Sequence, residues 1–176
     1  MNPLHVALDE YAVTEKTGAV HERRVLQYFH DLGHTWVKDD ETAWCSAFAG
    51  WVCKEAGVSY SDKLNARSWL AVGKETTSPE QGDVVVLWRE KKAGWKGHVG
   101  FFVTKRDGYI YILGGNQSNM VNISKYPESR LLGYRRVMAP TGATGKPVPQ
   151  FTISSVPSKE LITEFLERLK KNTLWT

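Results

Sequence analysis

The chain of 176 residues, with a mass of 19.9 kDa, is long enough for one ordinary domain and a short appendage. Hydrophobic residues make up 41% of it and charged residues 24%, a balance that excludes a largely disordered chain. The formal net charge of +4 is dispersed and comes without a nucleic-acid-binding motif, so no nucleic-acid partner is expected. Because neither a membrane-length apolar run nor a secretory signal is visible, we expect synthesis in the cytoplasm and no membrane insertion.

The hydrophobic pattern predicts helices first and strands second. Apolar residues at helical spacing, or a glycine that ends the pattern, mark four helical segments: 4–11, 25–32, 43–57 and 65–70. Segments rich in β-branched and aromatic residues then predict five strands: 83–88, 98–104, 109–113, 121–124 and 132–137. The dipeptide Asp107-Gly108 predicts a tight hairpin turn between two of them. This order favours an α+β fold with the helices packed on an antiparallel sheet.

The composition changes after residue 137. Residues 1–137 contain all the elements above and form the expected folded domain. Residues 138–157 are rich in proline and glycine, which is typical of a linker. Residues 158–176 predict an amphipathic helix with Ser158 as its N-cap. Such a helix either packs back on its own domain or contacts a partner or a cell wall.

The two cysteines, Cys45 and Cys53, lie in one predicted helix. Eight helical residues separate their Cα atoms by about 12 Å, which excludes a disulfide between them. Cys45 lies in the first turn, where the helix dipole and the unpaired N–H groups favour a thiolate and can hold an oxyanion. Cys53 has neither advantage and is interpreted as a small buried hydrophobic residue. Cys45 is therefore the candidate nucleophile.

A nucleophilic cysteine needs a base, and His98 is the best placed of the five histidines. It begins a predicted strand directly after a glycine-rich loop, where a rigid scaffold can present an imidazole to a cleft. The hairpin returns the end of the next strand to the same neighbourhood, so Asn116 either orients the imidazole or is simply a turn residue. His30 and His34 have i, i+4 spacing without a third ligand in sight, so no metal site is expected.

Six short motifs occur along the chain in a fixed order. They are Trp44–Phe48 (WCSAF), Ala66–Leu70 (ARSWL), Pro79–Val86 (PEQGDVVV), Gly97–Phe101 (GHVGF), Leu113–Gln117 (LGGNQ) and Leu132–Arg136 (LGYRR). Together they resemble the papain-like peptidoglycan hydrolases of the NlpC/P60 and CHAP superfamily, and more narrowly a phage-associated amidase or endopeptidase branch. The resemblance covers residues 3–137 and leaves out the tail.

The resemblance implies a fold, a reaction and a set of site residues. The fold is papain-like, with the helix that carries the catalytic cysteine packed on an antiparallel sheet. The reaction is hydrolysis of an amide bond in the peptidoglycan stem peptide, by an endopeptidase or an N-acetylmuramoyl-L-alanine amidase, without a metal or other cofactor. The implied catalytic residues are Cys45 as nucleophile, His98 as general base and acid, and Asn116 as the residue that orients His98.

Four further residues are candidates for substrate binding: Trp44, Trp69, Trp95 and Gln117. For Trp69 a place in the core is an equal alternative. The segment 89–96 carries four basic groups and one acidic group beside His98. It is either a solvated loop or a rim that meets the carboxylates of stem peptides.

Two other functions remain open at this point. One is a cysteine acyltransferase or protease that acts on a substrate outside the wall, and the other is an inactive wall-binding module of the same fold. For the hydrolase we expect a monomer that reaches the periplasm or the wall after release or delivery. Its candidate partners besides bacterial peptidoglycan are a secretion or lysis component and an immunity protein.

Overall fold

The structure is a computed structural model that describes residues 1–18, 20–139, 160, 163–164 and 167. The chain separates into two units, Met1–Thr141 and Gly142–Thr176, and the fold described here is that of the first. The predicted linker at 138–157 and the predicted helix at 158–176 therefore lie almost wholly outside the described residues. No helix in the described part of the chain is long and apolar enough to cross a membrane.

Four helical segments precede the main strands, as the sequence predicted. They are α1 (Pro3–Asp9), α2 (Arg23–Asp31), α3 (Cys45–Glu55) and the 3-10 helix η1 (Ala66–Ala71). The starts of α1, α2 and η1 are each capped by a side chain that accepts a hydrogen bond from a backbone N–H, namely those of Asn2, Glu22 and Asn65. Helix α3 has no such cap, which leaves the N–H groups of its first turn available at the site described below.

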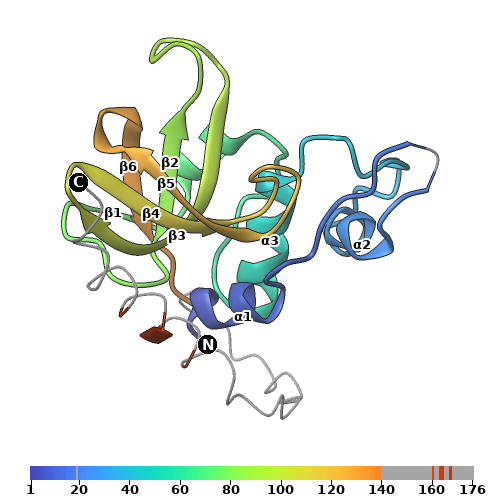
Figure 1. Cartoon of the computed structure of the whole chain (residues 1–176), viewed down its shortest axis with the longest axis horizontal. Coiled ribbons are helices and arrows are strands. Elements are labelled where there is room, and N and C mark those ends of the chain that lie inside the picture. The colour runs from blue at the N-terminus through green and yellow to red at the C-terminus, as the bar shows by residue number, and fades with distance from the viewer. Residues whose placement is uncertain (19, 140–159, 161–162, 165–166, 168–176) are drawn as a thin grey trace. The chain divides into compact units, whose positions relative to one another are not determined.

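The second part of the domain is a six-stranded antiparallel sheet in the order β1-β6-β2-β3-β4-β5 (Figure 1). Its strands are β1 (Lys74–Thr76), β2 (Val84–Trp88), β3 (Gly97–Arg106), β4 (Tyr109–Gly114), β5 (Asn122–Pro127) and β6 (Leu131–Arg136), with the short 3-10 helix η2 (Glu128–Arg130) before β6. Asp107 and Gly108 both adopt positive φ angles between β3 and β4, so the predicted tight turn is confirmed. The three-residue edge strand β1 was not predicted.

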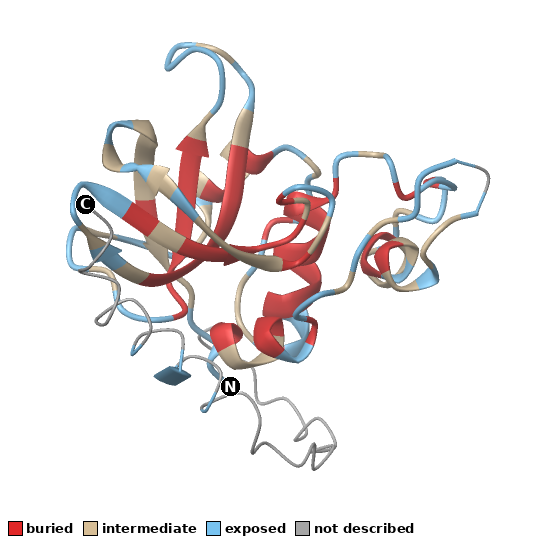
Figure 2. Ribbon diagram, viewed as in Figure 1, coloured by how far each residue is buried: buried red, intermediate tan, exposed pale blue. Residues whose placement is uncertain are grey.

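The two faces of the sheet are both covered by apolar side chains. On one face β3 and β4 pack against α1 and α3, and α2 packs on α3. On the other face a second cluster is formed by Val85, Leu87, Phe102, Ile110, Ile112 and Tyr134, with Tyr126 and Leu131 against it. Figure 2 shows that buried residues concentrate in α3 and in the central strands. The strands are thus fixed from both sides, which holds the start of β3 firmly beside the start of α3.

The expected α+β papain-like architecture is confirmed by this arrangement. Helix α3 is buried from Cys45 to Cys53, because its residues face the sheet, α1 and α2 at once. A helix that is buried all round cannot be moved without loss of packing on several sides. It is therefore a rigid support for whatever its first turn presents.

Candidate active site

Cys45 is the first residue of α3, and its side chain is buried. Burial raises the pKa of the Cys45 thiol, while the backbone amides of Val99 and Ser46 and the charge of Arg89 act in the opposite direction. The predicted thiolate therefore stands under two opposing influences: the loss of hydration favours the thiol, and the N–H groups at the helix start favour the thiolate.

His98 lies at the start of β3 and is 4% exposed. Its ring lies beside that of Tyr126, with 5.4 Å between the ring centroids. Burial lowers the pKa of His98 to about 4, against a smaller opposing effect of the hydrogen bond with Gln117. The imidazole is therefore neutral at neutral pH, the form that can take a proton.

The partner of His98 is Gln117, whose Oε1 lies 3.1 Å from His98 Nε2. The Gln117 amide nitrogen donates to the Asn122 carbonyl oxygen at 2.6 Å and to Asn122 Oδ1 at 3.1 Å. Because the amide nitrogen faces acceptors, Oε1 must be the atom that faces His98. It accepts from a protonated Nε2, which leaves Nδ1 as the unprotonated nitrogen.

Asn116 does not take the position that the sequence predicted for it. Its backbone is left-handed, with φ of +57°, and its side chain lines the cleft instead of holding His98. The preceding residue explains the turn: a Cβ on Gly115 would lie 2.5 Å from the ring of Trp44, so the chain passes tightly over the start of α3. The next side chain to point inward is that of Gln117, which corrects the expected Asn116 to its neighbour.

The predicted substrate-binding tryptophans divide into two groups. Trp44 and Trp69 are fully buried, and their indole N–H groups donate to Glu15 and Ser46 respectively. Both belong to the core, which corrects the assignment of Trp44 to the cleft and, for Trp69, favours the core over the cleft. Trp95 is 76% exposed and lines the cleft as expected. Gln117 is buried behind His98 and so is placed to orient the imidazole, not to bind substrate.

The cleft itself is a cavity of about 240 Å³ that joins Cys45 to His98. One wall is the end of the segment before η1, and the other is the connection between β2 and β3, which projects from the sheet (Figure 1). The lining residues are Ala43, Cys45, Leu64, Asn65, Ala66, Arg89, Glu90, Trp95, Lys96, Gly97, His98 and Asn116. A thiol, a neutral imidazole and backbone N–H groups at an uncapped helix start are the groups needed for acyl transfer.

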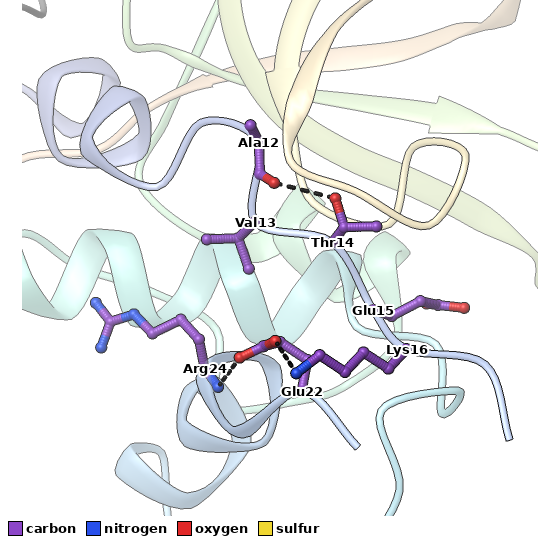
Figure 3. Close-up of a pocket in the computed structure, with 7 residues that line it drawn as sticks. All are labelled: Ala12, Val13, Thr14, Glu15, Lys16, Glu22 and Arg24. Carbon is purple, nitrogen blue, oxygen red and sulfur yellow. Dashed lines mark hydrogen bonds and ion pairs between the residues drawn. The ribbon is translucent and has the colours of Figure 1, made fainter. Parts of the chain in front are cut away.

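A larger hollow of about 440 Å³ lies elsewhere, between the segment 12–16 and the start of α2 (Figure 3). Its charged side chains are already engaged: Lys16 pairs with Glu22 at 3.2 Å, and Arg24 pairs with Glu10. No cysteine or histidine lines it. The hollow lacks a nucleophile and a base, so its size alone does not make it the reactive site.

The described residues contain no group of three or more histidine, cysteine, aspartate or glutamate side chains arranged to hold a metal. His30 and His34 instead place their Nε2 atoms against the backbone carbonyl oxygens of Val37 and Asp62. These contacts give the i, i+4 pair a structural role: His30 holds the segment before α3, and His34 holds the segment between α3 and η1.

Two functional candidates were missed in the sequence. Tyr126 was assigned no role, yet its ring flanks His98. Arg89 was treated only as part of a basic segment, yet its charge acts on both Cys45 and His98. The signal available for Arg89 was its place directly after β2, the strand that pairs with the start of β3.

A buried helix whose first residue is a cysteine, with a histidine at the start of an antiparallel strand lining the same cavity, is the arrangement of the papain-like class of fold. Comparison with protein families matches residues 25–116, more than half of the chain, to the CHAP domain. The protein belongs to this family, and membership implies a cell-wall amidase or peptidase activity in general. The matched residues include Cys45, His98 and Asn116. A search of curated proteins returned no match. The phage-associated branch stays a prediction.

Substitutions can distinguish the role of the Gln117 side chain from that of its neighbour Asn116. Gln117→Ala is expected to lower kcat/KM for a soluble muropeptide by about 10- to 10³-fold, because the imidazole loses the acceptor that fixes its tautomer. Asn116→Gly, which tolerates the left-handed backbone, is expected to stay within about threefold of the wild type. The acid limb of the pH profile should also move to lower pH in Gln117→Ala, since the hydrogen bond with Gln117 raises the pKa of His98. A larger loss in Asn116→Gly than in Gln117→Ala would restore Asn116 as the orienting residue.

Proposed function

We propose that the protein is a cysteine peptidoglycan hydrolase that cleaves an amide bond of the stem peptide with Cys45, His98 and Gln117. The observation that carries this proposal is the constraint on His98: its Nε2 is held by Gln117, so Nδ1 is the nitrogen free to act on a thiol in the same cleft. The family match supplies the substrate class. The expected Cys-His-Asn set thus becomes Cys-His-Gln.

The proposed reaction begins with the neutral thiol of Cys45 and the neutral imidazole of His98. Cys45 Sγ attacks the carbonyl carbon of the amide while its proton passes to His98 Nδ1. The backbone N–H groups at the start of α3 stabilise the oxyanion of the tetrahedral intermediate. As the C–N bond breaks, His98 returns the proton to the leaving amine, and a thioester with Cys45 remains.

Water completes the cycle. His98, neutral again, takes a proton from a water molecule, and the resulting hydroxide attacks the thioester carbonyl. The second tetrahedral intermediate expels the Cys45 sulfur, which recovers the proton from His98. The products are a carboxylic acid and the amine released in the first half. No other reagent is required.

The direct test is mass spectrometry of purified sacculi and soluble muropeptides after incubation with the full chain. We expect products that each contain one added water per cleaved bond, together with a new amine and a new carboxylate, whose identity assigns the bond. Cys45→Ala serves as the matched control. Intact sacculi and muropeptides with the wild type, alongside acyl transfer to or cleavage of another substrate, would favour the acyltransferase or protease instead.

The buried state of His98 predicts an unusual pH dependence. Because His98 must be neutral to accept the proton and its pKa is lowered to about 4, kcat/KM should be flat from about pH 5.5 to 8 and fall as the pH drops through about 4. The unfolded chain protonates its histidine near 6.5, so stability also declines as the pH falls from there, and circular dichroism must accompany each rate. An acid limb centred near pH 6.5 in folded protein would contradict this prediction.

We also propose that residues 1–137 contain the whole catalytic domain and that the rest is dispensable for chemistry. The carbonyl oxygen of Met138 accepts hydrogen bonds from Ser59, so a shortened chain should end at Ala139 to keep this contact. This chain is expected to hydrolyse a soluble muropeptide at the rate of the full chain. A truncated protein with a normal melting temperature but no hydrolysis would place part of the site in residues 140–176.

A further inference from the structure

The net positive charge of the cleft wall comes from one residue, Arg89. The charged side chains of this wall are Arg89, Glu90 and Lys96. Lys96 Nζ lies 2.6 Å from Glu90 Oε1, so these two neutralise each other. Among the residues that the structure describes, the Arg89 guanidinium forms no hydrogen bond and no ion pair. A cation without a partner at the mouth of a cleft is a ready site for an anionic group.

Arg89 lies close enough to the reacting groups to act on them. Its charge lowers the pKa of Cys45, of His98 and of Tyr126 alike. Arg89, Cys45 and His98 also line the same cavity of about 240 Å³. An anion that pairs with the Arg89 guanidinium is therefore held in the cavity that Cys45 and His98 line, close to the bond that Cys45 attacks.

The backbone segment that carries Arg89 is held in place by another arginine. The Arg67 guanidinium donates to the carbonyl oxygens of Lys96 at 3.0 Å, Lys92 at 3.1 Å and Lys91 at 3.3 Å. The Arg89 N–H also donates to the Lys96 carbonyl oxygen. With this many backbone contacts, the segment 89–96 is a shaped wall and not only a solvated loop.

Gly97 makes room for this contact. A Cβ at this position would lie 3.2 Å from Cγ of Arg67 and 2.9 Å from the Leu87 carbonyl oxygen. The Arg67 side chain thus crosses directly over the start of β3 to reach the segment. Its guanidinium is occupied by carbonyl oxygens, which leaves Arg89 as the cation that faces the cleft.

We propose that Arg89 is a specificity-determining residue that binds a free carboxylate of the stem peptide next to the scissile amide. The enzyme then selects peptides that carry this carboxylate over peptides in which it is an amide. A planar guanidinium matches a carboxylate with two parallel N–H···O bonds, and a carboxamide cannot reproduce both. The exposed ring of Trp95 lies on the same wall and offers an apolar surface beside the charge. This inference rests on the proposed function.

The test compares three soluble muropeptides with the full chain. One has free carboxylates, one is amidated on its glutamyl residue, and one is amidated at its C-terminus, so the two sources of carboxylate are distinguished. With the wild type we expect one amidated peptide to lose about 10- to 100-fold in kcat/KM, mainly through KM. Arg89→Gln should hydrolyse all three at similar rates, close to that of the disfavoured peptide. Lys92→Gln, on the same segment but outside the cleft, should keep the preference.

The possible results separate this inference from the function on which it rests. Equal hydrolysis of the three peptides by the wild type would overturn the role of Arg89 and leave the hydrolase intact. A preference that survives in Arg89→Gln would overturn it as well. Failure of the wild type to hydrolyse any of the peptides would contradict the proposed function and this inference together.

Discussion

Replacing Cys45 by alanine is expected to abolish hydrolysis of sacculi and muropeptides, with a loss of about 10⁴-fold or more in kcat/KM. The reason is chemical, because the side chain that we propose to form the acyl-enzyme is removed while the walls of the cleft remain. Cys45 is buried at the start of α3, and alanine is a good residue in a helix, so the fold should be kept. The measurement is product formation by mass spectrometry, with a melting curve for each protein.

Cys53→Ala is the matched control, since both cysteines lie in α3 and both are buried. Burial raises the pKa of Cys53 with no opposing contact, and Cys53 does not line the cleft. Its replacement is expected to cost about 1 kcal/mol of stability through lost packing and to leave the rate per folded molecule unchanged. Equal losses of rate in the two folded variants would remove the assignment of Cys45.

His98→Ala is expected to lower kcat/KM by about 10²- to 10⁴-fold, because every proton transfer of the proposed reaction passes through its imidazole. The effect should appear in kcat, since His98 is 4% exposed and offers little surface for binding substrate. Steady-state kinetics on a soluble muropeptide measures the division between kcat and KM.

A second readout distinguishes chemistry from packing at His98. His98→Gln retains a polar side chain of similar reach beside Gln117 but cannot act as a base, so it should be as inactive as His98→Ala while being more stable. Activity of His98→Gln above about a tenth of the wild type would show that another group moves the proton.

The sequence was sufficient for the order of helices and strands, because each element depends on local periodicity. The apolar runs that predicted strands at 83–88 and 109–113 correspond to β2 (Val84–Trp88) and β4 (Tyr109–Gly114). The edge strand β1 was not predicted because Lys74–Thr76 is mostly exposed and lacks an apolar pattern. These residues form a strand only by pairing with Tyr134–Arg136 of β6. That pairing is a property of the whole sheet.

The directions of side chains could be predicted from the sequence less well than the order of helices and strands. Trp44 was expected in the cleft, but the packing of Tyr28 from α2 and Phe48 around its ring buries it. Asn116 was expected to face His98. Because Gly115 passes close to Trp44 and Asn116 is left-handed, the residue whose side chain faces His98 is the next one, Gln117. In both errors a contact between segments distant in the chain is decisive: Tyr28 against Trp44, and Trp44 under Gly115. Sequence periodicity does not contain such contacts.

The hydrogen bonds of the Gln117 amide also limit which amino-acid substitutions are possible at position 117. A glutamate there would offer His98 a full negative charge, which in isolation favours an imidazolium. Its second oxygen, however, would meet the carbonyl oxygen of Asn122, where the amide nitrogen of Gln117 now donates at 2.6 Å. Two acceptors would then face each other in a buried place without a proton between them. Because that carbonyl oxygen belongs to the backbone, it remains whatever side chain stands at position 122. A glutamate at position 117 is therefore expected to keep its proton and donate it to this oxygen, so it would hold His98 as a neutral acid and not as a carboxylate.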